Sequence, residues 1–137
     1  KWAHIGDSRL YYFHRNRMVS RTLDHSVPQM LALGGQIKES EIRNHRDRNR
    51  VLRVLGTPWE GESYVVAESV KRSADQAFIL CSDGFWELIT EKEMERTMKQ
   101  SSSAAQWMEK MEKIVMKRGE SRDMDNYSAI CIYVDPE

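Results

Sequence analysis

Three aspartates in this chain of 137 residues lie in turns at the ends of strand-like runs. They occur in the sequences Gly6-Asp7-Ser8, Ser82-Asp83-Gly84 and Asp125-Asn126. Carboxylates without His or Cys partners at ligand spacing favour a hard cation such as Mg²⁺ or Mn²⁺. Carboxylates that are brought together repel each other and raise each other's pKa, and a divalent cation reverses both effects. Asp7, Asp83 and Asp125 are therefore candidate metal ligands, although any one of these turns taken alone is more often only a turn.

Hydrophobic patterning predicts the elements that must position these turns. Strand-like runs cover residues 2–5, 10–14, 18–21, 63–70, 77–82 and 127–134, and we expect the run 77–82 to be buried on both faces. A turn at residues 16–17 predicts a hairpin, and residues 51–55 could form a strand or a helical turn. Helices are predicted at 27–34, around 39–44, at 91–100 after a capping box, and from Ser102 or Ser103 to a glycine stop at Gly119. Strands that come early and helices that come late predict an α+β fold with largely antiparallel sheets.

Composition excludes several classes of protein. With 40% apolar and 31% charged residues, the chain is neither a disordered segment nor a membrane-spanning one, since no apolar run approaches about 20 residues. Lys plus Arg and Asp plus Glu number 21 each, so no basic excess points to nucleic acid. The arginine cluster of residues 43–50 is better explained as a solvated loop or a phosphate-facing flap. Cys81 and Cys131 lie inside apolar runs, which predicts buried, reduced thiols and a cytoplasmic protein.

The order of these motifs along the chain resembles the protein phosphatase 2C family of metal-dependent phosphatases, specifically its bacterial branch. The resemblance rests on five segments in the family's order. They are Gly6-Asp7-Ser8-Arg9, Asp24-His25-Ser26, the stretch from Glu39 to Gly56, Ser82-Asp83-Gly84-Phe85, and Asp125-Asn126-Tyr127-Ser128.

The resemblance implies two antiparallel sheets packed as a sandwich, flanked by helices, around a binuclear Mn²⁺ or Mg²⁺ centre. Asp83 and Asp125 would be ligands of the catalytic metals, and Asp7 with Asp83 would bind a third, more loosely held metal. Residues 27–50 would form a flap beside the site, and His25 and His45 would have structural or flap roles. The implied reaction is hydrolysis of phosphoserine or phosphothreonine on proteins by a metal-activated water, whose pKa falls from about 15.7 towards roughly 7.

The same resemblance implies that part of the catalytic domain lies outside residues 1–137. The family's phosphate-binding Arg, its bridging Asp-Gly and its proton-donating His have no counterpart here, so no catalytic side chain is identifiable beyond the metal ligands. The chain also begins inside a strand-like run without Met. We therefore expect a C-terminal portion of one domain that is inactive alone.

Several questions stay open at the level of sequence. We expect the chain to associate with the missing N-terminal half or with a second copy, and to act on phosphoproteins with a Ser/Thr kinase as a further partner. Neither nucleic acid nor a membrane is an expected partner. Asp123 is the alternative ligand to Asp125, which is preferred because it directly precedes Asn126 and the strand. A non-catalytic regulatory module that binds phosphoproteins or a kinase on the same fold is the alternative function.

Overall fold

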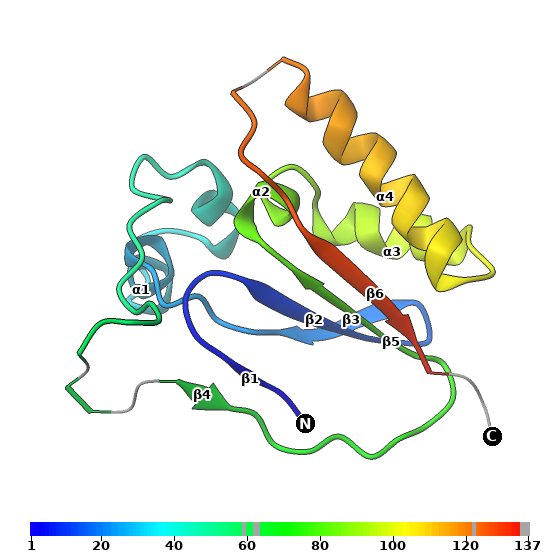
Figure 1. The fold of residues 1–137 in the computed structure, drawn as a ribbon, viewed down its shortest axis with the longest axis horizontal. Helices are drawn as coiled ribbons and strands as arrows, with labels where there is room; N and C mark the ends of the chain where they lie inside the picture. The colour runs from blue at the N-terminus through cyan, green and yellow to red at the C-terminus, as the bar shows by residue number, and fades with distance from the viewer. Residues whose placement is uncertain (59, 62–63, 122, 135–137) are drawn as a thin grey trace. The chain divides into compact units, whose positions relative to one another are not determined.

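The computed structural model describes residues 1–58, 60–61, 64–121 and 123–134 (Figure 1). The chain forms two compact units. Unit 1 contains Lys1–Ser8 and Thr22–Val70, and unit 2 contains Arg9–Arg21 and Lys71–Glu137. The boundary between the units therefore falls directly after the turn that carries Asp7, and Asp83 and Asp125 belong to unit 2. The predicted flap of residues 27–50 lies within unit 1, and its role stays a prediction.

Unit 2 is built on a four-stranded sheet in which every pairing is antiparallel. Its spatial order is β3 (Arg17–Arg21), β2 (Arg9–His14), β5 (Gln76–Cys81) and β6 (Ala129–Tyr133). The predicted hairpin of β2 and β3 is confirmed, with its turn at Arg15 and Asn16, where φ is 50° and 59°. Positive φ at both central residues gives the turn a twist that matches the strands it joins.

Two helices of unit 2 cover one face of this sheet. Helix α3 (Glu91–Lys99) begins with the predicted Thr90–Glu93 capping box, and α4 (Ala104–Gly119) begins at the N-cap Ser103. Trp107, Met111 and Val115 recur every four residues along α4 and are fully buried, so they form the apolar face of this helix. The Trp107 ring meets Phe13 of β2 edge-on at 5.2 Å. Gly119, predicted to follow the helix, is its last residue.

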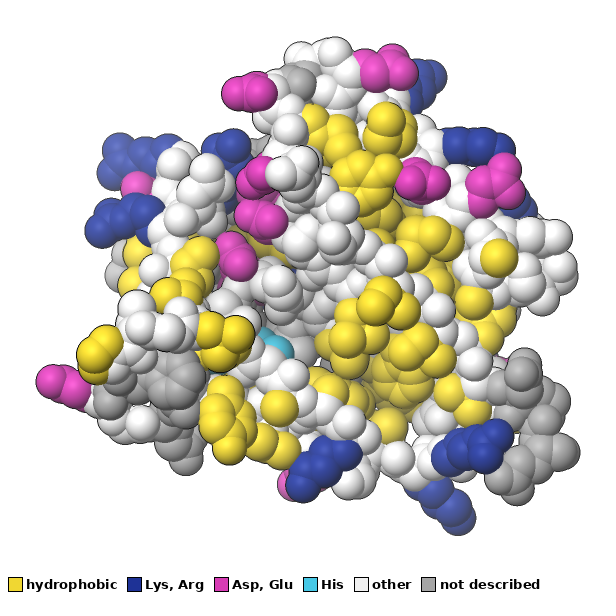
Figure 2. All heavy atoms as spheres, in the orientation of Figure 1, with side chains coloured by type: hydrophobic (Ala, Val, Ile, Leu, Met, Phe, Trp, Pro, Cys, Tyr) yellow, Lys and Arg dark blue, Asp and Glu magenta, His cyan; other side chains and the backbone are white. Residues whose placement is uncertain are grey.

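The opposite face of the sheet carries apolar side chains that are only partly covered. Alternation along the strands and their register place Leu10, Leu80 and Ile130 in one row of this face and Tyr12, Phe78 and Ile132 in the next. Leu80 is 39% exposed, Ile130 61% and Ile132 43%. Figure 2 shows apolar side chains gathered over β5 and β6. The prediction that residues 77–82 are buried on both faces is therefore wrong, because the described helices pack on one face only.

Unit 1 contains little regular sheet. Strand β1 (Ala3–His4) pairs with β4 (Val65–Val66), so the predicted strand over 63–70 shrinks to two residues, and Ser63 lies outside the described residues. Helix α1 (Val27–Leu33) is followed by Gly34, as predicted, and its N-cap is Ser26. Element η1 (Glu39–Asn44) is a 3₁₀ helix. Of residues 51–55, only Val51 pairs, through one antiparallel bridge to Ser26.

These elements confirm an α+β fold with two antiparallel sheets and helices. Within the described part of the chain, no helix combines the length and the hydropathy that a membrane crossing requires. Cys81 is buried and Cys131 half-buried, and neither forms a disulfide bond within the described residues. Burial raises the pKa of Cys131 to about 12, so this thiol stays protonated and unreactive near pH 7.

An ion pair joins the beginning of α3 to the last turn of α4. Arg118 donates from Nη2 to Oε1 of Glu93 at 2.6 Å and from Nη1 to Oε2 at 2.8 Å. Burial alone would raise the pKa of Glu93, but hydrogen bonds from Arg118 and Thr90 outweigh it and lower the pKa from 4.5 to about 2. Because the folded pKa is the lower one, the ionised carboxylate stabilises the fold above about pH 4.5, and this contribution disappears as the pH falls towards 2.

Substitution Glu93→Gln should reduce the free energy of unfolding at pH 7 by about 1–2 kcal/mol, because it removes a charge-assisted pair. The difference from wild type should shrink between pH 4.5 and pH 2, where Glu93 becomes protonated. Urea denaturation at pH 7 and pH 3 measures both effects. Glu109→Gln is the control, since the exposed Glu109–Lys113 pair should contribute much less. Equal effects of the two variants would contradict the argument.

Candidate metal centre

Asp83 lies where the central strand β5 turns into a short helix, α2 (Asp83–Trp86). The sequence predicted only a turn here, but Phe85 and Trp86 are buried and hold this segment as one helical turn on unit 2. Oδ1 of Asp83 accepts a hydrogen bond from the backbone N–H of Gly84 at 2.9 Å. A carboxylate has about four acceptor positions, so this bond leaves capacity to bind a cation.

Gly84 brings the backbone next to Asp83 against the backbone next to Asp125. A Cβ atom at position 84 would lie 2.5 Å from the carbonyl oxygen of Asn126 and 3.1 Å from that of Asp125. The first distance is too short for any real side chain, so only glycine permits this approach. The two predicted ligands Asp83 and Asp125 are therefore carried by segments in direct contact.

Two serines fasten the same two segments together. The backbone N–H of Ser82 donates to the carbonyl oxygen of Ser128 at 3.0 Å, and the N–H of Ser128 donates to Oγ of Ser82 at 3.0 Å. Beside them, the rings of Phe85 and Tyr127 lie 6.1 Å apart. This reciprocal pair continues the β5–β6 ladder by one step and sets the register of Asp125 relative to Asp83.

Asp125 is exposed, and its Oδ1 accepts from the backbone N–H of Asn126 at 2.7 Å. The alternative ligand Asp123 is also exposed. Between them, Met124 lies against Gly119, where even a single Cβ would collide with the Met124 side chain. The carbonyl oxygen of Asp125 lies 3.1 Å from the Cβ position of Gly84. The choice of Asp125 over Asp123 as a ligand stays a prediction.

The buried side chain of Arg9 packs against α2 and supports it. The guanidinium carbon of Arg9 lies 3.4 Å from the ring centroid of Trp86, and Nη1 donates to the hydroxyl of the buried Tyr11 at 3.0 Å. A planar guanidinium can stack on an aromatic face and still donate hydrogen bonds at its edge, which a lysine ammonium cannot do equally well. Sequence reasoning noticed Arg9 only as part of a motif and missed this supporting role.

Asp7 lies in unit 1, directly after a glycine turn. Gly6 is buried and has φ of +83°, a conformation that other residues rarely adopt. The neighbouring His25 forms two hydrogen bonds with Gly6, one through its backbone N–H and one through its ring. The rings of His4, His25 and His45 each form a hydrogen bond with a backbone group, and the structural or flap roles of His25 and His45 stay a prediction.

Two of the three predicted ligands, Asp83 and Asp125, lie on segments whose backbones are in contact. Asp83 and Asp125 belong to touching segments of unit 2, and Asp7 belongs to unit 1. Within residues 1–58, 60–61, 64–121 and 123–134, no group of three or more His, Cys, Asp or Glu side chains is placed to hold a metal ion. The donor set of paired carboxylates nevertheless has the chemistry that Mg²⁺ or Mn²⁺ prefers.

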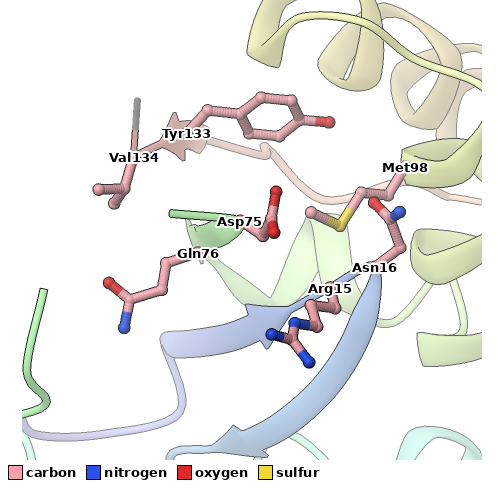
Figure 3. Close-up of a pocket in the computed structure, with 7 residues that line it drawn as sticks. All are labelled: Arg15, Asn16, Asp75, Gln76, Met98, Tyr133 and Val134. Atoms are coloured by element: carbon pink, nitrogen blue, oxygen red, sulfur yellow. The ribbon is translucent and has the colours of Figure 1, made fainter. Parts of the chain in front are cut away.

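A separate pocket of about 330 Å³ lies at the other end of β5 (Figure 3). It is lined by Arg15, Asn16, Asp75, Gln76, Met98, Tyr133 and Val134. Oη of Tyr133 is buried without a hydrogen-bond partner among the described residues. Burial raises the pKa of this phenol to about 12. The pocket begins where β5 starts, whereas Asp83 follows the strand's end, so it is distinct from the aspartate site.

Comparison with known proteins gives a consistent picture. No protein-family model matches the chain. A serine/threonine phosphatase of Listeria welshimeri is 32% identical over 130 residues, covering 95% of this chain and 50% of the relative. A putative protein phosphatase 2C-type protein of Streptococcus pyogenes is 28% identical over 138 residues, covering 99% and 53%. The chain spans about half the length of the curated relatives it matches.

Solved structures show the same fold. The serine/threonine phosphatase of Mycobacterium tuberculosis matches with a TM-score of 0.78 and 22% identity, over 97% of this chain and 54% of that chain. A catalytic domain of a serine/threonine protein phosphatase that contains two manganese ions matches with a TM-score of 0.71 and 21% identity, over 97% and 53%.

Substitution Gly84→Ala tests the backbone contact. The added Cβ would collide with the Asn126 carbonyl, so α2 and the Asp125 segment must separate, at a cost of about 1–3 kcal/mol in the free energy of unfolding. The control Gly34→Ala also places a Cβ beside a backbone carbonyl, but at an ordinary 3.4 Å, and should change stability by less than about 0.5 kcal/mol. Urea denaturation measures both, and a fully stable Gly84→Ala variant would refute the close approach.

Proposed function

We propose that this chain is the C-terminal part of a metal-dependent protein serine/threonine phosphatase, since the proteins similar to it are named serine/threonine phosphatases or a putative protein phosphatase 2C-type protein. Residues 1–137 would form one portion of a single catalytic domain, with residues 27–50 as its flap. The substrates would be phosphoserine and phosphothreonine on cytoplasmic proteins, and a Ser/Thr kinase would be the opposing partner.

The observation that carries this proposal is the contact of Gly84 with the Asp125–Asn126 backbone. It brings into contact the backbone segments that carry two aspartates assigned to the metals by the resemblance, although these aspartates lie 42 positions apart in the sequence. Asp83 and Asp125 would hold the catalytic metals, and Asp7 with Asp83 would hold the third. A structural neighbour contains two manganese ions, and carboxylate oxygens suit Mn²⁺ and Mg²⁺ alike.

The residues of this chain would act by binding and orienting. Asp83 and Asp125 each bond to the next backbone N–H, which fixes how the carboxylate is presented. Ser82, Ser128 and Gly84 keep the backbone segments that carry the two carboxylates in register. When bound, the metal supplies a water of lowered pKa and neutralises charge on the phosphoryl group.

The partly covered sheet face is where the rest of the domain would dock. Leu80, Ile130 and Ile132 form an apolar surface on β5 and β6, and β6 is an edge strand of the described sheet. Such a surface favours association with further chain. The chain spans about half of its relatives, so we propose that the N-terminal half of the domain covers this face. A second copy of the chain is the competing occupant.

In the full-length protein, Asp83→Asn and Asp125→Asn should each lower kcat/KM for p-nitrophenyl phosphate at least about 100-fold, because each removes a metal ligand. Calorimetric titration should show correspondingly weaker Mn²⁺ binding. Asp123→Asn is the matched control and should behave like wild type. If Asp123→Asn abolishes activity instead of Asp125→Asn, the ligands are misassigned. Unchanged Mn²⁺ affinity in Asp83→Asn would favour the non-catalytic phosphoprotein- or kinase-binding module.

The isolated 137-residue chain should hydrolyse little or no p-nitrophenyl phosphate with Mn²⁺, and adding the separately expressed N-terminal half should restore turnover. Ile130→Lys on the exposed face should prevent this complementation. The Asp83→Asn chain should still bind the N-terminal half but give no activity. Robust turnover by the chain alone, or a dimer by light scattering that excludes the N-terminal half, would contradict the proposed arrangement.

A further inference from the structure

Three segments of unit 1 meet at the turn before Asp7. The backbone N–H of His25 donates to the carbonyl oxygen of Gly6 at 2.8 Å, and the N–H of Leu52 donates to the carbonyl oxygen of His25 at 2.7 Å. A Cβ atom at Gly6 would lie 3.6 Å from the carbonyl oxygen of Arg53. The backbone around residue 6 is therefore tied to residue 25, which is itself tied to residue 52.

The His25 side chain adds a second bond to the same glycine. The backbone N–H of Gly6 donates to Nδ1 of His25 at 3.1 Å. His25 thus bonds both the N–H and the C=O of the residue immediately before Asp7. Because the N–H of a residue and its carbonyl lie on either side of its Cα, the two bonds together restrict rotation about both φ and ψ of Gly6.

His4 holds the His25 ring in position. The two imidazole rings are stacked, with centroids 4.9 Å apart and planes 13° from parallel. Nε2 of His4 lies 2.8 Å from the carbonyl oxygen of Leu23, within hydrogen-bond distance. The ring of His25 therefore has one face fixed by packing, and its Nδ1 points at the Gly6 amide.

This arrangement requires the neutral form of His25. An imidazole nitrogen can accept a hydrogen bond only when it carries no proton, so the proton of the neutral ring is on Nε2. Burial, followed by the charges of His4 and Arg53, lowers the pKa of His25, and only Asp24 opposes this. The ring is consequently neutral and able to accept at neutral pH.

We propose that His25 is a positioning residue that sets the direction of the Asp7 carboxylate by fixing Gly6 through its backbone N–H and its Nδ1. The inference rests on the proposed function only in assigning Asp7 to a metal. Gly6 has no side chain to restrain its backbone, so hydrogen bonds must do so. Without the Nδ1 acceptor, the turn would sample more conformations, and Asp7 would meet a cation in the required geometry less often.

The decisive measurement is hydrogen exchange of the Gly6 amide, followed by nuclear magnetic resonance in the full-length protein. His25→Gln moves the acceptor one bond further from the backbone, and Gly6 should exchange at least about tenfold faster. His25→Asn keeps an acceptor on Cγ, where Nδ1 is attached in histidine, and should restore much of the protection. Unchanged protection in His25→Gln would overturn the proposal, whatever its effect on metal binding.

His45→Gln is the matched control for this experiment. His45 also lies in unit 1, and its Nδ1 also accepts from a backbone N–H, that of Asp47 at 3.1 Å. Its substitution should leave Gly6 exchange unchanged. Faster Gly6 exchange in His45→Gln to the same extent would indicate general loosening of unit 1 and would overturn the assignment of a specific role to His25.

A thermodynamic cycle separates this inference from the proposed function. Calorimetric Mn²⁺ titration should show that His25→Gln weakens the Asp7-dependent site about tenfold, with no further loss when it is added to Asp7→Asn. Additive losses would overturn a role for His25 that acts through Asp7. If Asp7→Asn alone leaves Mn²⁺ binding intact, the ligand assignment fails, while Gly6 exchange still decides whether His25 fixes the turn.

Discussion

The approach of Gly84 to the Asp125–Asn126 backbone is the constraint on which the rest of unit 2 depends. Two main chains can come this close only where one residue lacks a Cβ. The hydrogen bonds between Ser82 and Ser128 hold the two segments in register. The guanidinium of Arg9 stacks on Trp86 and so supports α2. Backbone contacts therefore hold together the two segments that carry Asp83 and Asp125. Rotation of side chains alone cannot separate these segments.

The two units stabilise their parts of the candidate site by different physical means. In unit 2, Asp83 continues directly from β5, a strand paired on both sides with β2 and β6, which contact the buried Trp107 of α4 through Phe13 and Tyr133. In unit 1, the strands beside Asp7 are two residues long. Individual hydrogen bonds consequently determine more of the local order there, and segments of this kind open more easily than sheet cores.

Local signals predicted the helices well, because their determinants lie within a few residues. The Thr90–Glu93 capping box and Ser103 mark helix starts where the structure has them, and the helix predicted from residue 27 begins at Val27. Predictions that depended on distant partners did less well. Hydrophobic periodicity could not distinguish a strand from a helical turn over residues 51–55. In the structure, Val51 forms a single antiparallel bridge to Ser26. Leu80 was expected to be buried, since an apolar run cannot indicate which of its faces the helices will cover.

From its order of motifs, the sequence by itself determined the phosphatase resemblance, the α+β class and the aspartates worth considering. These three conclusions depend on residue identity and on patterns between residues close in sequence, which can be read without knowing the fold. Only the tertiary structure decided that Asp83 and Asp125 are carried by touching segments, and that both the backbone and the ring of His25 bond to Gly6. Those facts arise from contacts between residues 19 to 42 positions apart, and such contacts exist only once the backbone has folded.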